Sequence, residues 1–182
     1  MIKYEITDEV HPRNWDLRRI RALRDIPRHN VKAGDLGGYV ESEDNLSQEG
    51  DAWVGDEAWV RGTAFVSGDA LVYEDAYVYE RARVSGNAYV YGNAWIYGNA
   101  RVSGDALVFE NARVYGIAYV FGDAEVSDEA LVSGNAEVFG AARVSGRAWV
   151  SGNARVSGEA RVFDDAEVSG DAEVSGNARV SE

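Results

Sequence analysis

The side chains best suited to general acid–base catalysis in this sequence are its two histidines, His11 and His29. Both precede a strictly repetitive region that begins at Ala52 and contains no insertion. The sequence has no cysteine, which excludes thiol nucleophiles, thiolate metal sites and disulfides. A zinc site that needs three histidines is also excluded. We therefore expect ordinary surface or cap histidines, and we assign no catalytic residue and no cofactor.

A column of carboxylates is the most regular charged feature, and we call it the acidic corner. Its members replace a recurrent glycine at positions that differ by multiples of 18, namely Asp56, Glu74, Glu110, Asp128 and Asp164. If 18 residues form one turn of a solenoid, adjacent turns lie ~5 Å apart. Neighbouring carboxylates would then repel, and a hard cation such as Ca²⁺ would bridge them. The alternative is a solvated edge that prevents aggregation. We retain the five residues as a candidate metal site.

Aromatic side chains form a second pattern, since 14 of the 20 Phe, Trp and Tyr residues lie within residues 51–121. One group combines Trp59, Tyr77 and Trp95 with Tyr79, Tyr97 and Tyr115; a neighbouring group combines Trp53 and Tyr89 with Tyr73, Tyr91 and Phe109. Exposed aromatic patches usually mark an interface, although stacking between strands also stabilises a sheet by itself. We predict a contact face for self-association. Cross-strand stacking alone, or a ligand such as a sugar or nucleobase, are the alternatives.

The elements that position these side chains follow from an internal repeat. Alanine recurs every six residues from Ala52 to Ala178, 22 times in all, and a valine follows two residues later, replaced once by Ile96. A short extended run A-x-V-z, followed by a Gly-Asn or Gly-Asp turn, fits this period better than a helix. Alternation along the extended run places Ala and Val inside and the residues x and z outside. All aromatic side chains of the repeat are therefore predicted to point outward.

Three such units make one coil, because like residues recur at intervals of 18. Tyr79, Tyr97 and Tyr115 are followed in the same phase by serines at positions 133, 151 and 169. Three faces of six residues predict an all-β fold, a triangular parallel β-helix of about seven regular coils.

The unit V-S-G-N-A-x resembles the hexapeptide motif of left-handed parallel β-helices, which implies the left-handed sense. Leu17–Val54, "LRRIRALRDIPRHNVKAGDLGGYVESEDNLSQEGDAWV", resembles the start of YdcK-like hexapeptide proteins, which are common in bacterial genomes and prophages. Members are often labelled transferases or polymer-forming cytoskeletal proteins. Hexapeptide proteins also include carbonic anhydrases and inert scaffolds, so the resemblance indicates a fold and leaves the activity open.

The same resemblance implies an N-terminal cap with an irregular first coil over residues 1–45 and a hexapeptide β-helix over residues 46–182. Val40 and Leu46 share the six-residue phase of the interior alanines, which is consistent with that first coil. The segment "LRRIRALRDI" permits a strand or a helix, and the resemblance favours a strand.

The charge excludes some partners. The net charge is −13, with −2 in residues 1–50 and −11 in residues 51–182. So acidic a protein is repelled by nucleic acid and by anionic membranes. The N-terminus has no apolar run typical of a signal peptide or membrane span. We expect a cytoplasmic protein with neither nucleic-acid nor membrane partners.

These observations favour a non-enzymatic scaffold, a rigid acidic solenoid of bacterial or prophage origin. We expect it to form a homo-oligomer, as a trimer or as an end-to-end dimer through the uncapped repeat "GNARVSE" at the C-terminal end. A hexapeptide acyltransferase with a site between subunits is one alternative. An acidic decoy that binds a basic host protein is another.

Overall fold

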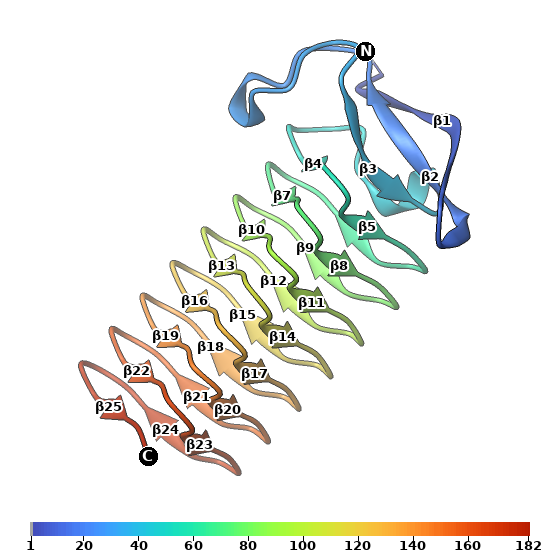
Figure 1. The fold of residues 1–182 in the computed structure, drawn as a ribbon. Helices are drawn as coiled ribbons and strands as arrows, with labels where there is room; N and C mark the ends of the chain where they lie inside the picture. Colours follow the sequence, from blue (N-terminus) through green and yellow to red (C-terminus); the bar gives the residue numbers. More distant parts are fainter. Residues whose placement is uncertain (1) are drawn as a thin grey trace.

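The computed structural model describes residues 2–182 as a straight triangular rod with a small cap at its N-terminal end (Figure 1). Three sheets run along the rod, and each turn after the first contributes one two-residue strand to each sheet. The predicted all-β triangular parallel β-helix is confirmed. Eight strands, β3 to β23, stack in parallel in the ten-stranded sheet, so the solenoid has about eight turns. The turn beyond the seven regular coils comes from the cap, which supplies β3.

We name the sheets by size. The long sheet contains β1 (Tyr4–His11), β2 (Asn14–Ala22), β3 (Leu36–Val40), β5 (Trp59–Val60), β8 (Tyr77–Val78), β11 (Trp95–Ile96), β14 (Arg113–Val114), β17 (Leu131–Val132), β20 (Trp149–Val150) and β23 (Glu167–Val168). The eight-stranded sheet contains β4 (Trp53–Val54), β7 (Leu71–Val72), β10 (Tyr89–Val90), β13 (Leu107–Val108), β16 (Glu125–Val126), β19 (Arg143–Val144), β22 (Arg161–Val162) and β25 (Arg179–Val180). The seven-stranded sheet contains β6 (Phe65–Val66), β9 (Arg83–Val84), β12 (Arg101–Val102), β15 (Tyr119–Val120), β18 (Glu137–Val138), β21 (Arg155–Val156) and β24 (Glu173–Val174).

The interior is the predicted ladder of alanine and valine. Every repeat alanine from Ala52 to Ala166 is fully buried, and so is every ladder residue two positions after an alanine from Val54 to Val162, which is valine except at Ile96. Parallel pairing places each valine on the valine 18 residues later, for example Val90 on Val108. Valine fills the flat faces, and alanine, whose side chain is a single methyl group, lies beside each corner.

The corners are sharp because one residue in each adopts a left-handed backbone. That residue is usually glycine, as at Gly104, where φ is 72° and an added Cβ would lie 2.8 Å from the backbone nitrogen of Gly122. Acidic residues adopt the same conformation at Asp56, Glu74, Glu80, Glu110, Asp128 and Asp164, with φ between 51° and 61°. A side chain in this region costs about 1–2 kcal/mol relative to glycine, so another interaction must offset it.

The cap is an antiparallel β1–β2 hairpin, followed by β3 and two short 3₁₀ helices, η1 (Pro27–His29) and η2 (Glu43–Asn45). The strand predicted for "LRRIRALRDI" is confirmed as far as Ala22. Along the rod, backbone carbonyls accept hydrogen bonds from N–H groups of the preceding coil. At the first turn, side chains of the cap donate hydrogen bonds to such carbonyls instead. Lys3 Nζ donates to Ala52 O at 2.7 Å, and Asn45 Nδ2 donates to Ala64 O at 2.9 Å. The cap thus satisfies the open edge of the solenoid.

Two expectations about the first turn are wrong. Val40 pairs with Val60, and Leu46 bridges to Val66, so both occupy the valine ladder and not the alanine phase. Each pair is separated by 20 residues, because the corner between Leu46 and Val54 is two residues longer than the others. In addition, Trp53 is only 3% exposed. It points away from the solenoid interior as predicted, but the cap covers it.

Candidate binding site

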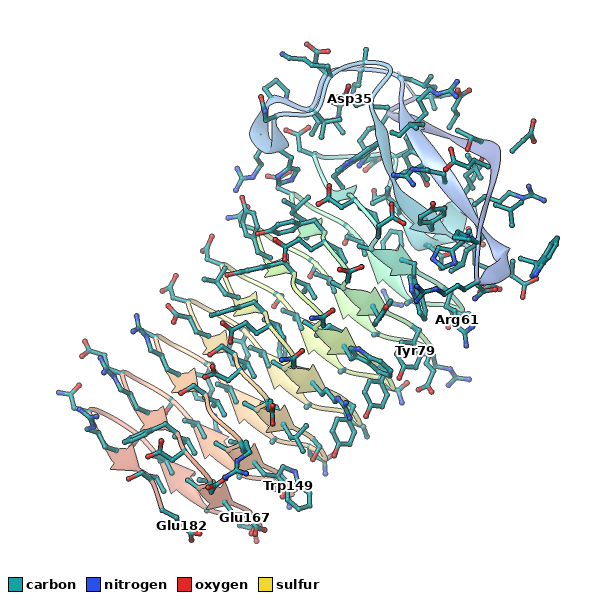
Figure 2. The ribbon with its side chains drawn as sticks, viewed as in Figure 1. Asp35, Arg61, Tyr79, Trp149, Glu167 and Glu182 are labelled. Carbon is teal, nitrogen blue, oxygen red and sulfur yellow. The ribbon has the colours of Figure 1, made fainter. Side chains whose placement is uncertain are left out.

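A groove lies where the cap meets the long sheet. The β1–β2 turn, residues 11–14, overhangs the outer face of β5, β8 and β11 and encloses a volume of about 530 Å³. Four aromatic side chains line it, namely Trp59, Tyr77, Tyr79 and Trp95. Figure 2 shows Arg61, Tyr79 and Trp149 following one another along this side of the rod. The groove thus combines residues from the start of the chain with residues more than forty positions later.

The floor of the groove is a continuous row of rings. The centroids of Trp59 and Tyr77 are 4.5 Å apart, and those of Tyr77 and Trp95 are 5.3 Å apart at an interplanar angle of 89°. Parallel pairing of β5, β8 and β11 fixes this order, because each ring belongs to the first residue of its strand. Trp95 is 36% exposed. The row therefore presents an apolar surface that spans three coils and remains accessible.

Charged side chains surround this floor in balanced numbers. Glu57 and Asp75 supply carboxylates, and Arg13 and Arg61 supply guanidinium groups. The guanidinium of Arg61 lies 5.5 Å from the centroid of Trp59, a cation–π contact. Glu57 pairs with Arg19 of the cap at 3.1 Å. Within residues 2–182, no hydrogen bond or ion pair engages the side chain of Asp75, Arg13 or Arg61, so these groups are available to a ligand.

A stacked column of tyrosines borders the long sheet on its other side. Tyr79, Tyr97 and Tyr115 lie with adjacent centroids 5.0 Å apart and interplanar angles of 5° and 3°. Ile117 follows at the same corner and is 63% exposed. We call these four residues the tyrosine edge. Burial raises the pKa of Tyr79 and of Tyr97 above the usual tyrosine range, so these phenols stay neutral near pH 7.

The second predicted aromatic column lies on the eight-stranded sheet. Tyr73 stacks on Tyr91, and Tyr91 on Phe109, with centroids 5.0 Å apart in both pairs. Burial, with a smaller contribution from Tyr91, raises the pKa of Tyr73 to about 12. The structure therefore separates the predicted contact face into two columns on different corners and a groove floor between them.

The repeats themselves match a known family. The model of the YdcK β-solenoid repeat matches residues 82–98, 94–110, 100–116 and 142–158. Over these segments the chain is similar to YdcK β-solenoids. No curated protein matches the chain. The matched segments lie within the rod, and the repeat that they share specifies the fold without specifying an activity.

In this YdcK-like solenoid the acidic corner has a structural role that the sequence did not reveal. Each of four carboxylates in it accepts a hydrogen bond from the backbone N–H of the residue 18 positions later. Asp56 accepts from Glu74, Glu74 from Gly92, Glu110 from Asp128, and Asp128 from Gly146, at 2.8–3.2 Å. These charge-assisted bonds offset the cost of the left-handed backbone.

No group of three or more His, Asp or Glu side chains in the described part of the chain is arranged to hold a metal ion. The metal site predicted for Asp56, Glu74, Glu110, Asp128 and Asp164 therefore stays a prediction. Their spacing follows from the solenoid pitch, and four of them already bind backbone N–H groups.

Substitution of Asp128 separates these two roles. We expect Asp128→Ala to lower the free energy of unfolding by about 1–2 kcal/mol, because the left-handed backbone remains and the Gly146 N–H loses its acceptor. Asp128→Gly is the matched control and should cost less than about 1 kcal/mol, because glycine adopts this conformation without strain. Urea unfolding measures both. If millimolar Ca²⁺ raises the melting temperature of the wild type but not of Asp128→Asn, that result would support a metal site at the acidic corner.

The two histidines lie in different parts of the cap. The ring of His11 packs edge-on against Tyr39, with centroids 4.7 Å apart, and its Nδ1 accepts the N–H of Arg13. His29 Nε2 lies 3.1 Å from the backbone carbonyl of Asp69, and burial lowers the pKa of His29. The two rings make separate contacts, each with a backbone atom or an aromatic ring. His11 instead forms part of the groove wall.

Sequence reasoning missed the residues of the hairpin turn, Pro12, Arg13 and Asn14. Proline and asparagine are strong turn signals, and they predict a tight connection at this point. That signal does not indicate which face of the rod the turn overhangs.

No helix within residues 2–182 is both long and apolar enough to cross a membrane.

Proposed function

We propose that this chain is a non-enzymatic scaffold, a rigid acidic rod that self-associates through its tyrosine edge. The observation that carries the proposal is the flat, stacked and partly exposed column of Tyr79, Tyr97 and Tyr115, which continues into Ile117. Aromatic residues are enriched at protein interfaces, and a rigid column loses little conformational entropy on binding.

Ile117 is the most informative residue of this edge. Neighbouring coils place asparagine at the equivalent position, as at Asn99 and Asn135. A polar residue suits an exposed corner. An apolar β-branched residue there stabilises a structure only when a binding partner buries its side chain. Ile117 is 63% exposed in the single chain. Its position beside Tyr115 extends the apolar surface of the tyrosine edge.

The distribution of charge favours a second copy of the chain as the partner at this edge. The corner between the eight-stranded and long sheets is strongly acidic. From residue 56 to residue 165 it holds nine acids and one arginine: Asp56, Glu57, Glu74, Asp75, Glu110, Asp128, Glu129, Asp164, Asp165 and Arg147. From residue 61 onward, the corner that carries the tyrosine edge holds two acids and two arginines, namely Glu80, Asp171, Arg61 and Arg81. Two rods that meet at the tyrosine edge keep their acidic corners apart, which limits repulsion.

Mass measurement in solution tests the proposal. We expect sedimentation velocity between about 1 and 100 µM to show a reversible oligomer, a range in which moderate interfaces dissociate. Ile117→Asn and Tyr115→Ser should each weaken it at least about tenfold, since central apolar contacts dominate interface energies. Both substitutions introduce residues that other coils carry at the same position, so the fold should persist.

Tyr91→Ser is the matched control, because Tyr91 stacks in the same way but lies on the eight-stranded sheet. It should leave the oligomer within about twofold of the wild type. A protein that remains monomeric at 100 µM, or one whose oligomer is weakened by Tyr91→Ser alone, would contradict the proposal. The stoichiometry from sedimentation also distinguishes a dimer from a trimer.

A further inference from the structure

We propose that the groove between the β1–β2 turn and the long sheet binds a neutral oligosaccharide of two or three rings. This site goes beyond the scaffold function, because it lies between the cap and the first coils and needs no second chain. The inference rests on the apolar floor, the balance of charge around it and its extent along the rod.

The floor provides the apolar contact. One face of a pyranose ring carries mainly C–H groups, whose weakly positive hydrogens are attracted to the negative face of an aromatic ring. Trp59, Tyr77 and Trp95 offer such surfaces in one continuous row. A cavity of about 530 Å³ with an aromatic lining and a few polar groups has the size and composition of a small-molecule site.

The rim provides polar contacts of both kinds. Arg61 and Arg13 can only donate hydrogen bonds, whereas the carboxylate of Asp75 only accepts them. A ligand that satisfies all three must both donate and accept, and a hydroxyl group does so without carrying charge. None of these three side chains is hydrogen-bonded or ion-paired within residues 2–182. A hydroxyl-rich ring therefore fits this rim.

The charge balance disfavours ions. A cationic ligand would approach Arg13 and Arg61, and the guanidinium of Arg61 already lies against Trp59 at 5.5 Å. An anionic ligand would approach Glu57 and Asp75, on a protein with a net charge of −13. A neutral ligand avoids both penalties, because it loses no ionic hydration when it enters the groove.

The length of the floor indicates more than one sugar ring. The three floor residues come from consecutive coils, so the row spans about 10 Å along the rod, at ~4.8 Å between coils. A single ring would cover only part of this row. Above the floor, the turn that contains Pro12 forms a wall that is conformationally restricted. The ligand would therefore lie along the rod, beneath the turn.

Tryptophan fluorescence and calorimetry test the site with defined probes: cellotriose, maltotriose, mannotriose and tri-N-acetylchitotriose. We expect at least one to bind with a dissociation constant below about 1 mM. Trp95→Ala should weaken binding at least about tenfold. Trp149→Ala is the matched control, because Trp149 occupies the same position of the long sheet three coils later and is similarly exposed, 41% against 36%. It should change binding less than about twofold.

The proposal is overturned if none of the four sugars binds at millimolar concentration, or if Trp149→Ala weakens binding as much as Trp95→Ala does. It is also overturned if choline, acetate or adenosine binds more tightly than every sugar. The titrations are repeated in Ile117→Asn, which lies outside the groove. We expect sugar binding to persist in that variant, whether or not the substitution changes self-association. Loss of one property without the other would therefore contradict only one of the two proposals.

Discussion

Val102→Asp is expected to lower the free energy of unfolding by at least about 4 kcal/mol, the largest effect of any single substitution considered for this solenoid. Val102 is fully buried in β12, where it stacks between Val84 and Val120. A carboxylate there would lose its hydration and find no partner among the alanine and valine side chains that fill the interior. The corresponding drop in melting temperature is roughly 10 °C for a chain of this length, measurable by circular dichroism.

Arg101→Asp is the matched control, because Arg101 is the other residue of the same two-residue strand and points outward. It pairs with Arg83 on the preceding coil, an arrangement of like charges that a carboxylate would relieve. We expect a change within about 0.5 kcal/mol. Comparable losses from the two substitutions would contradict the strict alternation of inside and outside in the rod.

Stability should rise with pH between about 8 and 10, because Lys3 is buried beneath the first turn. Loss of hydration, with a further contribution from Arg24, lowers the pKa of Lys3 to about 8. Between that value and about 10.5, the unfolded chain binds more protons at this residue than the folded chain. The free energy of unfolding therefore increases with pH over this interval, by up to about 3 kcal/mol. Urea unfolding at pH 7.5, 9 and 10 measures the increase.

Above pH 10 the trend should reverse. Burial raises the pKa of Tyr4 and of Tyr73, so these phenols stay protonated in the folded chain after they ionise in the unfolded one. The free energy of unfolding then decreases as pH rises. Lys3→Met should abolish the increase between pH 8 and 10 and keep the decrease above pH 10. A wild-type stability that is constant or falls from pH 8 to 9.5 would show that Lys3 keeps its ammonium hydrated.

The sheets and the solenoid interior were predictable because the repeat is exact. Alanine and valine lie two residues apart in a period of six, and this spacing fixes which side chains point inward and which point outward. Like residues recur every 18 positions, which fixes three faces per coil. The two aromatic columns, for example Tyr97 on Tyr115, followed from the same register. Prediction failed where the period is interrupted, since the longer corner before Val54 shifted Val40 and Leu46 by two residues.

The role of the acidic corner could be located but not explained from sequence. The spacing of Asp128 and Gly146 showed that they stack, and the same spacing suited a metal site and a solvated edge. The role of the carboxylate depends on the direction in which its side chain points when its backbone is left-handed. In the folded chain Asp128 turns toward the next coil and accepts the Gly146 N–H.

By itself, then, the sequence determined the parts of this protein that repeat: the three sheets, the buried ladder and the stacking of outward side chains. These are local consequences of a short period, because each coil contacts mainly its neighbours. Only the tertiary structure decided where the cap lies, that it covers Trp53, and that the β1–β2 turn closes a groove over Trp59, Tyr77 and Trp95. Such contacts join segments without a common period, and their geometry depends on how irregular segments pack, which no spacing in the sequence encodes.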